Sequence, residues 1–222
     1  EADYLYAQII HCNADWKPSL LKPIEYVEGY NEFELNQFEF SINTKVPYIH
    51  FRFQLPKVKV SGNYLIKVYR NEKEEDLILT QRFIVYESMV RVNSGIGLLS
   101  GVSNALSNQQ VEFTINYQGL TINNPMEEVK VSIRQNYRWD HAIQQLKPRF
   151  VKIQTSTLEY NYFNMENAFK GDNEFRTFDM SSFDGVQNVR EVVYGRKINR
   201  VILQPDDPRT NRVYDGTWFD HN

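Results

Sequence analysis

The sequence contains one cysteine, Cys12, among its 222 residues, so no disulfide can form within the chain. Since no second thiol lies nearby in the sequence, we expect Cys12 to be a small packed residue rather than a reactive nucleophile. Disulfides would have indicated an exported protein, but their absence does not exclude export.

The sequence also lacks an excess of charge and any long apolar run. It has 25 basic and 28 acidic residues, which are interleaved along the chain and give a net charge of −3. This pattern argues against a phosphate-binding nucleic-acid interface and against a polybasic membrane patch. The apolar stretches are only a few residues long, which is too short for a membrane-spanning helix. We therefore expect no nucleic-acid partner and no direct membrane insertion.

Catalytic and phosphate-binding motifs are missing as well. The glycines at positions 95, 97 and 101 are spaced unlike a phosphate loop, and no Lys-Ser/Thr pair follows them, so we expect a flexible loop there. No G-x-S-x-G elbow occurs. Neighbouring carboxylates such as Glu127 and Glu128 would face opposite ways in a strand, so they do not converge for acid–base chemistry.

Metal-binding spacing is equally hard to find. The chain has no second cysteine to join a metal site, and its four histidines are scattered without paired spacing: His11, His50, His141 and His221. A zinc site has no positive support. The acidic turn Gly171–Glu174 offers oxygen ligands for calcium but lacks the spacing of a known calcium loop. We predict a protein that is not an enzyme and has no cofactor, no metal and no small-molecule substrate.

Aromatic residues are abundant instead, with 14 Tyr, 14 Phe and 3 Trp. Such side chains favour strands because they fit a pleated, half-buried surface. The segments Phe38–Ile42 and Tyr48–Phe53 alternate with period two, which predicts two strands and places His50 on a polar face. Tyr64–Tyr69 and Leu77–Tyr86 predict a hairpin, with the charged run Asn71–Asp76 as its exposed tip.

The remaining segments continue the same pattern. Further strands are predicted at Val111–Tyr117, Val129–Gln135, Leu158–Phe163, Glu174–Asp179, Arg196–Leu203 and Arg212–Tyr214. The Gly/Ser/Asn-rich segment Ser94–Asn108 predicts a long loop. Helical periodicity is nearly absent, and the best candidate is a short turn at Trp139–Gln145 with Asp140 as its cap. The fold class predicted is all-β, with two tandem antiparallel β-sandwich domains of immunoglobulin or fibronectin III type at residues 1–87 and 88–222.

Several segments combine polar residues with an aromatic at the end of a predicted strand. We favour a role in which Asn and Asp fix loop backbone while aromatics close the ends of the sandwiches, and direct contact with a partner is the alternative. The candidate positions are His11, Asp15, Trp16, Asn31, Glu32, Arg138, Trp139, Asp140, Asn173, Glu174 and Arg176.

Eight segments, in order along the chain, follow a family pattern: His11–Trp16, Gly29–Glu32, Val46–Phe53, Ser61–Tyr64, Asn124–Val131, Asn136–Asp140, Gly171–Arg176 and Gln204–Arg209. In these segments the chain resembles the plug proteins of the Bacteroidetes type IX secretion system, a family earlier known only as a domain of unknown function. Family members are longer, so the chain would correspond to their N-terminal part.

The resemblance implies a periplasmic protein, peripheral to the outer membrane, whose partner is an outer-membrane β-barrel translocon protein. It implies a non-enzymatic plug that gates the periplasmic opening of that barrel, and it offers no catalytic residues. The chain begins at Glu1 without an initiating Met or a signal peptide, so we expect a mature or trimmed piece of a longer protein.

Aromatic richness on a β-sandwich leaves one alternative function, a carbohydrate-binding module. That function requires exposed, coplanar aromatic rings, for which the three tryptophans Trp16, Trp139 and Trp218 are the first candidates. Burial of these rings would remove its main support.

Overall fold

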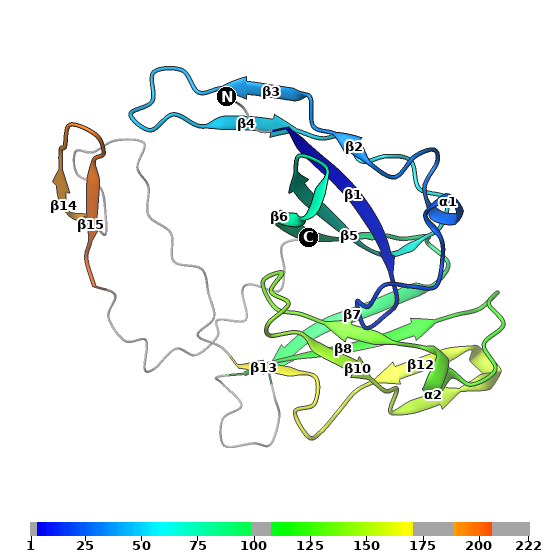
Figure 1. Ribbon diagram of the computed structural model, residues 1–222. Coiled ribbons are helices and arrows are strands. Elements are labelled where there is room, and N and C mark those ends of the chain that lie inside the picture. Colours follow the sequence, from blue (N-terminus) through cyan, green and yellow to red (C-terminus); the bar gives the residue numbers. More distant parts are fainter. Residues whose placement is uncertain (1–3, 99–107, 171–188, 206–222) are drawn as a thin grey trace. The chain divides into compact units, whose positions relative to one another are not determined.

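The computed structural model describes residues 4–98, 108–170 and 189–205 (Figure 1). Its contacts divide the chain into unit 1, which is Glu1–Glu87 with Tyr194–Asn199, and unit 2, which is Ser88–Val193 with Arg200–Asn222. Both units are built from antiparallel strands, and none of the sheets closes into a barrel. The prediction of an all-β protein is confirmed. No helix of the described ranges is long and apolar enough to cross a membrane.

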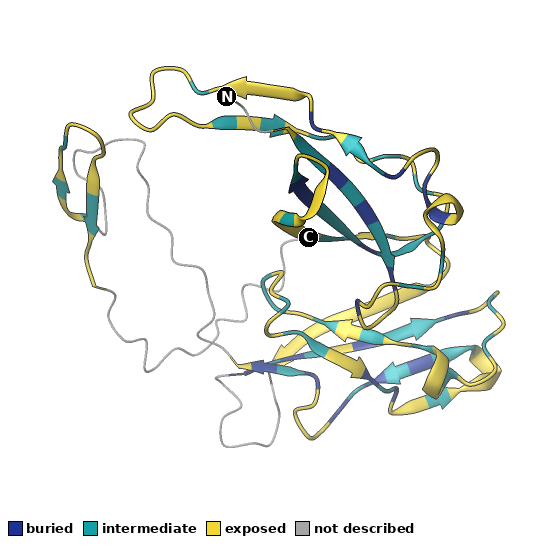
Figure 2. Ribbon diagram, in the orientation of Figure 1, coloured by how far each residue is buried: buried dark blue, intermediate teal, exposed yellow. Residues whose placement is uncertain are grey.

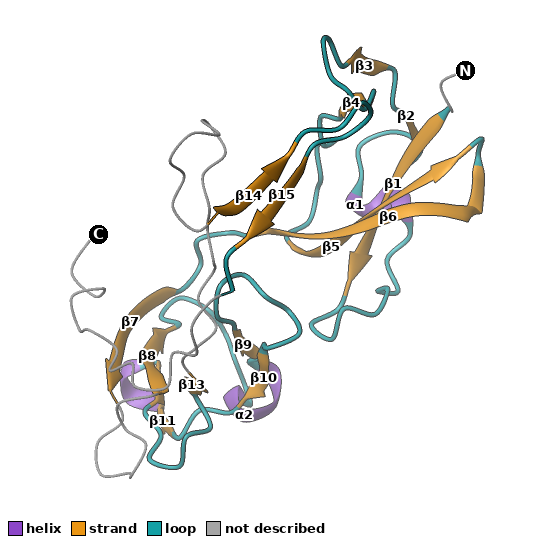
Figure 3. Cartoon of the chain, turned by 90° about the vertical axis from the view of Figure 1, so that its left-hand side faces the viewer, coloured by secondary structure: helices purple, strands orange, loops and turns teal. Residues whose placement is uncertain are grey.

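Unit 1 is organised around a four-stranded sheet in the order β2-β1-β5-β6. A separate two-stranded sheet pairs β3 with β4, and a one-turn helix, α1, follows β1 (Figures 1 and 3). The bounds are β1 Leu5–Cys12, α1 Pro23–Tyr26, β2 Phe33–Glu34, β3 Gln37–Phe40, β4 Ile49–Arg52, β5 Gly62–Arg70 and β6 Lys73–Val85.

Alternation along β1 and β5 produces the core of unit 1. Ala7 and Ile9 on β1 stand opposite Val68 and Ile66 on β5, so these side chains share one face of the sheet. Ala7 and Ile9 are fully buried, and Val68 is nearly so, whereas β3 is exposed along its whole length (Figure 2). Residues from α1 and the loops cover that face of the sheet.

The β5–β6 hairpin is tighter than the sequence suggested. Only Asn71 and Glu72 form the turn, both with positive φ (51° and 57°), and β6 already begins at Lys73. Two central residues with positive φ are typical of the turn whose twist matches a β-hairpin. Residues 73–76 of the predicted tip Asn71–Asp76 therefore belong to β6 and not to the turn, although residues 73–75 are exposed as predicted. There, Glu74 pairs with Lys67 across the strands at 2.8 Å.

Unit 2 is organised around the long strand β8. On one side β8 pairs with β12 and β13, and it also pairs with β7. β11 extends this sheet by pairing with β12, and two separate two-stranded sheets are β9–β10 and β14–β15. The bounds are β7 Arg91–Leu98, β8 Asn108–Asn116, α2 Pro125–Glu128, β9 Val131–Ile133, β10 Ile143–Leu146, β11 Phe150–Lys152, a 3₁₀ turn Ile153–Thr155, β12 Thr157–Tyr160, β13 Ala168–Lys170, β14 Val189–Val193 and β15 Arg200–Leu203.

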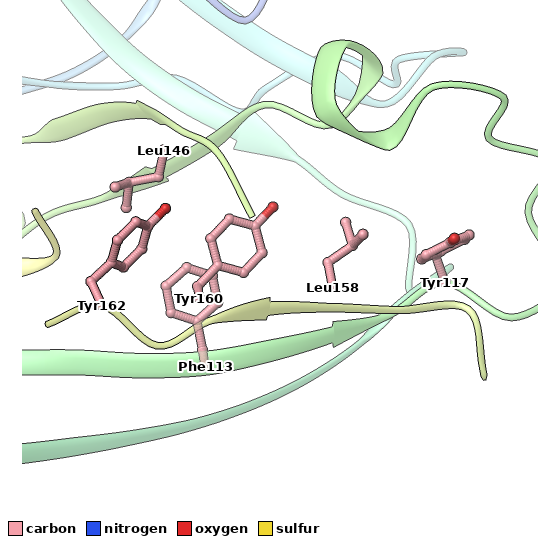
Figure 4. Close-up of a cluster of buried hydrophobic side chains, with 6 residues drawn as sticks. All are labelled: Phe113, Tyr117, Leu146, Leu158, Tyr160 and Tyr162. Carbon is pink, nitrogen blue, oxygen red and sulfur yellow. The ribbon is translucent and has the colours of Figure 1, made fainter. Parts of the chain in front are cut away.

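The core of unit 2 is aromatic. Phe113 on β8 and Tyr160 on β12 are paired residues, and their rings stack with centroids 4.4 Å apart (Figure 4). The other buried members of this cluster are Tyr117, Leu146, Leu158 and Tyr162. Stacked pairs of this kind contribute about 0.5–1.5 kcal/mol beyond the area they bury.

Two sequence predictions in unit 2 are wrong. The first five residues of the predicted loop Ser94–Asn108 belong to β7, and Asn108 begins β8, because β-pairing between β7 and β8 overrides the weak strand preference of Gly, Ser and Asn. Residues 99–107 lie outside the described residues. The predicted helical turn Trp139–Gln145 is a turn followed by β10, whose pairing with β9 satisfies the backbone instead. The α-helices found among the described residues are single turns that begin with Pro23 and Pro125.

Candidate functional site

His11 lies inside unit 1 rather than at an open site. Its Nδ1 is 2.8 Å from Ser19 Oγ, and its ring meets Tyr64 edge-on with centroids 5.0 Å apart. Gly62 lies directly against the ring, since a Cβ there would come within 2.4 Å of His11 Nε2. Its φ of +151° also favours glycine. The imidazole therefore holds the loop after β1 against the start of β5.

Asp15 and Trp16 shape the same loop. Asp15 accepts a hydrogen bond from the backbone N–H of Lys17 at 3.2 Å, and this bond is the leading reason why the pKa of that carboxyl lies below its usual value. Trp16 has positive φ (65°) and is only 9% exposed. The Arg82 guanidinium lies over its ring, 4.8 Å from the centroid. A ring covered in this way is not available to stack on a sugar.

Asn31 and Glu32 occupy the edge of the sheet beyond β2. The Asn31 side chain accepts from the Ile9 N–H at 3.2 Å and donates to the Ile9 carbonyl at 2.8 Å. One amide thus replaces the neighbouring strand that β1 lacks at this position. Glu32 accepts a hydrogen bond from the buried Tyr69 hydroxyl, and burial together with this carboxylate raises the pKa of Tyr69.

Arg138, Trp139 and Asp140 form a second group, in unit 2. Arg138 binds Asp140 through two hydrogen bonds, Nε–Oδ1 at 3.1 Å and Nη2–Oδ2 at 2.5 Å. Arg138 is the first cause of a lowered pKa at that exposed carboxyl. Trp139 is half-buried, and the guanidinium of Arg134, not of Arg138, lies 4.3 Å from its ring centroid. The next ring, Tyr137, is 86% exposed and has positive φ.

The three remaining candidates, Asn173, Glu174 and Arg176, lie outside the described residues, as do the calcium-like turn Gly171–Glu174 and Trp218. Among the candidates that the structure describes, His11, Asp15 and Trp16 meet in one loop region, while Asn31 and Glu32 lie together at a sheet edge. Within the described ranges, no three His, Cys, Asp or Glu side chains come together as they would to hold a metal ion.

Cys12 lies at the end of β1. It is buried, as predicted, and its thiol lies 3.6 Å from the Ile10 carbonyl. Burial raises the pKa of this thiol. A neutral, buried thiol behaves as a small hydrophobic residue.

A surface hollow of about 520 Å³ lies in unit 2 at the start of β7. Its lining residues are Ser88, Met89, Val90, Arg91, Asn93, Asn116 and Gln118. Arg91 alone carries charge among these lining residues, so the hollow offers an amide- and hydroxyl-rich wall without a paired acid and base.

The most deeply buried polar side chain of the described residues was not predicted from the sequence. Asn167 is fully buried, and its amide donates to the Val111 carbonyl at 2.6 Å and to the Tyr160 carbonyl at 3.3 Å. Its Oδ1 accepts from Gln110 Nε2 at 3.1 Å. In a polar segment such as Phe163–Ala168, no local sequence signal distinguishes a buried asparagine that hydrogen-bonds strand backbone from an exposed asparagine in a turn.

Comparison with known proteins identifies a matching family model and a solved structure of similar fold. Residues 1–87 match the family model "Type 9 secretion system plug protein 1st domain". No curated protein matches the chain. A crystal structure of a hypothetical protein from Parabacteroides merdae ATCC 43184 is 30% identical, with a TM-score of 0.87.

That likeness covers 97% of this chain, and the chain spans 55% of the length of the Parabacteroides protein. The similar fold therefore continues well beyond the segment that the family model matches. The resemblance seen in the sequence is confirmed for residues 1–87, which match the first domain of the plug proteins of the type IX secretion system.

Proposed function

We propose that the chain is part of a non-enzymatic plug subunit that seals the periplasmic opening of the outer-membrane type IX translocon barrel. The observation that carries the proposal is the match of residues 1–87 to the first plug domain. In this proposal the protein is periplasmic and peripheral to the outer membrane, and its partner is the translocon β-barrel.

The chemistry of the described candidates supports a mechanical role. The side chains of His11, Asn31 and Asn167 form hydrogen bonds with loop and backbone atoms of their own unit. Side chains that are used in this way stiffen a β-sheet body, because each buried donor or acceptor penalises a change of geometry. A plug that must resist opening of a wide pore benefits from such stiffness.

The finer architecture is part of the same proposal. We assign residues 1–87 and 88–222 to two tandem β-sandwiches of immunoglobulin or fibronectin III type. We also assign the plug-family motif positions to scaffolding in both domains rather than to direct contact with the barrel. The paired sheets of unit 1 and the aromatic cluster of unit 2 are the observations behind this assignment.

The test uses the full-length gene product in its own host. An affinity-tagged copy is purified from detergent-solubilised outer membranes, and the translocon barrel is expected to co-purify with it. Deletion of the gene is expected to raise outer-membrane permeability to large hydrophilic dyes, because an unplugged pore conducts them. A full-length protein that never associates with the barrel, together with unchanged permeability and secretion after deletion, would contradict the proposal.

The carbohydrate-binding alternative is not favoured. Trp16 is buried beneath Arg82, and Trp139 is half-buried beneath Arg134. Neither ring is presented as part of a flat exposed row. Calorimetric titration with common polysaccharides is expected to give no binding heat.

A further inference from the structure

Strand β7 is a long edge strand in unit 2. It has eight residues, and its register with β8 runs without a shift from Arg91–Asn116 to Leu98–Gln109. Among the described strands, β8 is its one partner. Positions 91–97 are all exposed. Within the described part of the chain, the strand therefore has one backbone edge without a partner strand.

The register reveals which backbone groups that edge carries. The N–H of Val111 donates to the Asn167 carbonyl at 3.0 Å, and this bond directs Val111 away from β7. In an antiparallel ladder, the residue opposite such a position also points away from its neighbour. Ile96 is the residue opposite Val111. By the same alternation, Val92, Ser94 and Ile96 turn their N–H and C=O groups to the outer edge.

The usual protections of an edge strand are missing along β7. Edge strands are normally short, bulged, or interrupted by Pro or charge, because unpaired backbone groups template pairing with another chain. From Val92 to Gly97 this strand has no charge and no Pro, and its register has no bulge. A Cβ placed on Gly95 or on Gly97 would meet no other atom within 4 Å, so the backbone is also open to close approach.

Apolar side chains flank this edge. Val92 and Ile96 stand opposite Ile115 and Val111, two residues that pack against the aromatic core. They nevertheless remain 54% and 49% exposed, because no further strand of the described chain covers them. An added strand with β-branched residues at matching positions would extend the sheet and cover both side chains.

We propose that β7 is an interaction edge that pairs antiparallel with β7 of a second copy of this chain, centred on Ser94. The inference does not depend on the proposed function. In this register Val92 of each copy stands opposite Ile96 of the other, and Ser94 meets its own counterpart. Arg91 falls opposite Gly97, so the one cation of the strand does not face its copy. The edge is thus self-complementary in shape, polarity and charge, as a two-fold interface requires.

Two proline variants separate pairing from folding. Ser94→Pro removes an outward N–H that β8 does not use, and Pro is tolerated at such edge positions. Asn93→Pro removes an N–H in the ladder with β8, since Asn93 and Thr114 form the alternate, hydrogen-bonded kind of pair. Ser94→Ala keeps the outward N–H and serves as the matched control for loss of the hydroxyl.

Sedimentation velocity over a range of protein concentrations measures the outcome. The unaltered chain and Ser94→Ala are expected to show a concentration-dependent dimer, with a dissociation constant on the order of micromolar for so small an interface. Ser94→Pro is expected to weaken dimerisation at least about tenfold with an unchanged melting temperature. Asn93→Pro is expected to lower the melting temperature.

A cross-linking experiment checks the register. In a Cys12→Ala background, Ser94→Cys is expected to give a covalent dimer with a short bifunctional maleimide, because the two Ser94 side chains stand directly opposite each other. Arg91→Cys is expected to give much less, because residue 91 and its copy lie six positions apart, about 20 Å along the paired strands. A chain that stays monomeric at all concentrations overturns the proposal, as does a dimer that Ser94→Pro leaves intact. If the chain is monomeric and Ser94→Pro only abolishes co-purification with the translocon barrel, the edge takes a partner's strand and self-pairing is overturned.

Discussion

Both units hold an asparagine side chain against strand backbone, but they do so to different depths. Asn31 in unit 1 binds the N–H and C=O of one residue, Ile9, at a place where the sheet has no further strand. Asn167 in unit 2 binds two carbonyls from two strands and also accepts from Gln110. Loss of the asparagine hydrogen bonds at a sheet edge affects only the residues beside it. Loss of the hydrogen bonds that an asparagine makes to two strands affects the centre of the unit.

The strongest test of this contrast is Asn167→Leu. The substitution leaves the buried carbonyls of Val111 and Tyr160 without these donors, which is expected to cost about 3–5 kcal/mol of unit 2 stability. Hydrogen exchange read by mass spectrometry should show lost protection in β8 and unchanged protection in β5. Asn164→Leu, an exposed asparagine of the same segment, is the control and is expected to change stability by less than about 0.5 kcal/mol.

Asn31→Leu is expected to cost less, about 2–3 kcal/mol of unit 1 stability, because only the N–H and C=O groups of Ile9 lose this partner. Loss of exchange protection should be confined to β1 and the sheet edge beside it. The exposed Asn36→Leu is the matched control. A loss of stability equal to that of Asn167→Leu would contradict the distinction between the asparagine at the sheet edge and the asparagine between strands.

Two glycines sharpen the comparison further. Gly62→Ala in unit 1 places a Cβ against His11 at a positive φ, so we expect a loss of about 2 kcal/mol in urea unfolding. Gly95→Ala in unit 2 meets open space and is expected to be neutral or to stabilise by up to about 0.5 kcal/mol. Adding His11→Ala to Gly62→Ala should recover part of the loss, since the steric part disappears and the backbone strain remains.

Substitution of two buried tyrosines by phenylalanine is expected to change stability in opposite directions. The Tyr64 hydroxyl donates to the Val60 carbonyl at 2.6 Å, so Tyr64→Phe should cost about 1 kcal/mol. The Tyr160 hydroxyl has no hydrogen-bond partner among the described residues, so Tyr160→Phe should stabilise unit 2 by up to about 1 kcal/mol. Thermal unfolding of the two variants measures both signs, and equal losses would contradict the contrast.

The pH dependence gives the smallest effect. Burial, and then the nearby Tyr162, raise the pKa of Tyr160 from 10.0 to about 12. The folded state therefore holds this proton more tightly than the unfolded chain does. Its contribution is fully present below pH 10 and is lost as the pH rises through about 12. By pH 10.5 the expected loss is under about 1 kcal/mol, and Tyr160→Phe should remove that part of the slope in urea titrations.

Local pattern predicted the strands where alternation was strong. Phe38–Ile42 and Tyr48–Phe53 correspond to β3 and β4, and His50 stands exposed opposite Glu39 as its place on the polar face required. Pairing decided the weaker segments. Gly95 and Gly97 favour a loop by themselves, yet they lie in β7 because β8 offers a continuous ladder of partners.

The candidate positions show the same limit. Sequence pattern marked Asn31 and Trp16 as notable, but the Ile9 backbone and the Arg82 guanidinium that give them roles lie 22 and 66 positions away in the chain. Asn167 escaped notice because its partners, Val111 and Tyr160, belong to strands that meet only after folding. The predicted roles of Asn173, Glu174 and Arg176 stay predictions.

The sequence alone determined the all-β class, the lack of an intrachain disulfide and the plug-family resemblance of the N-terminal region. These depend on composition, on short-range alternation and on ordered local segments, all of which are written along the chain. The tertiary structure decided which polar side chains hydrogen-bond strand backbone, which glycine has no room for a side chain and which strand lies at a sheet edge. Those properties depend on pairing between distant segments, because hydrogen-bond satisfaction and burial are set by neighbours in space.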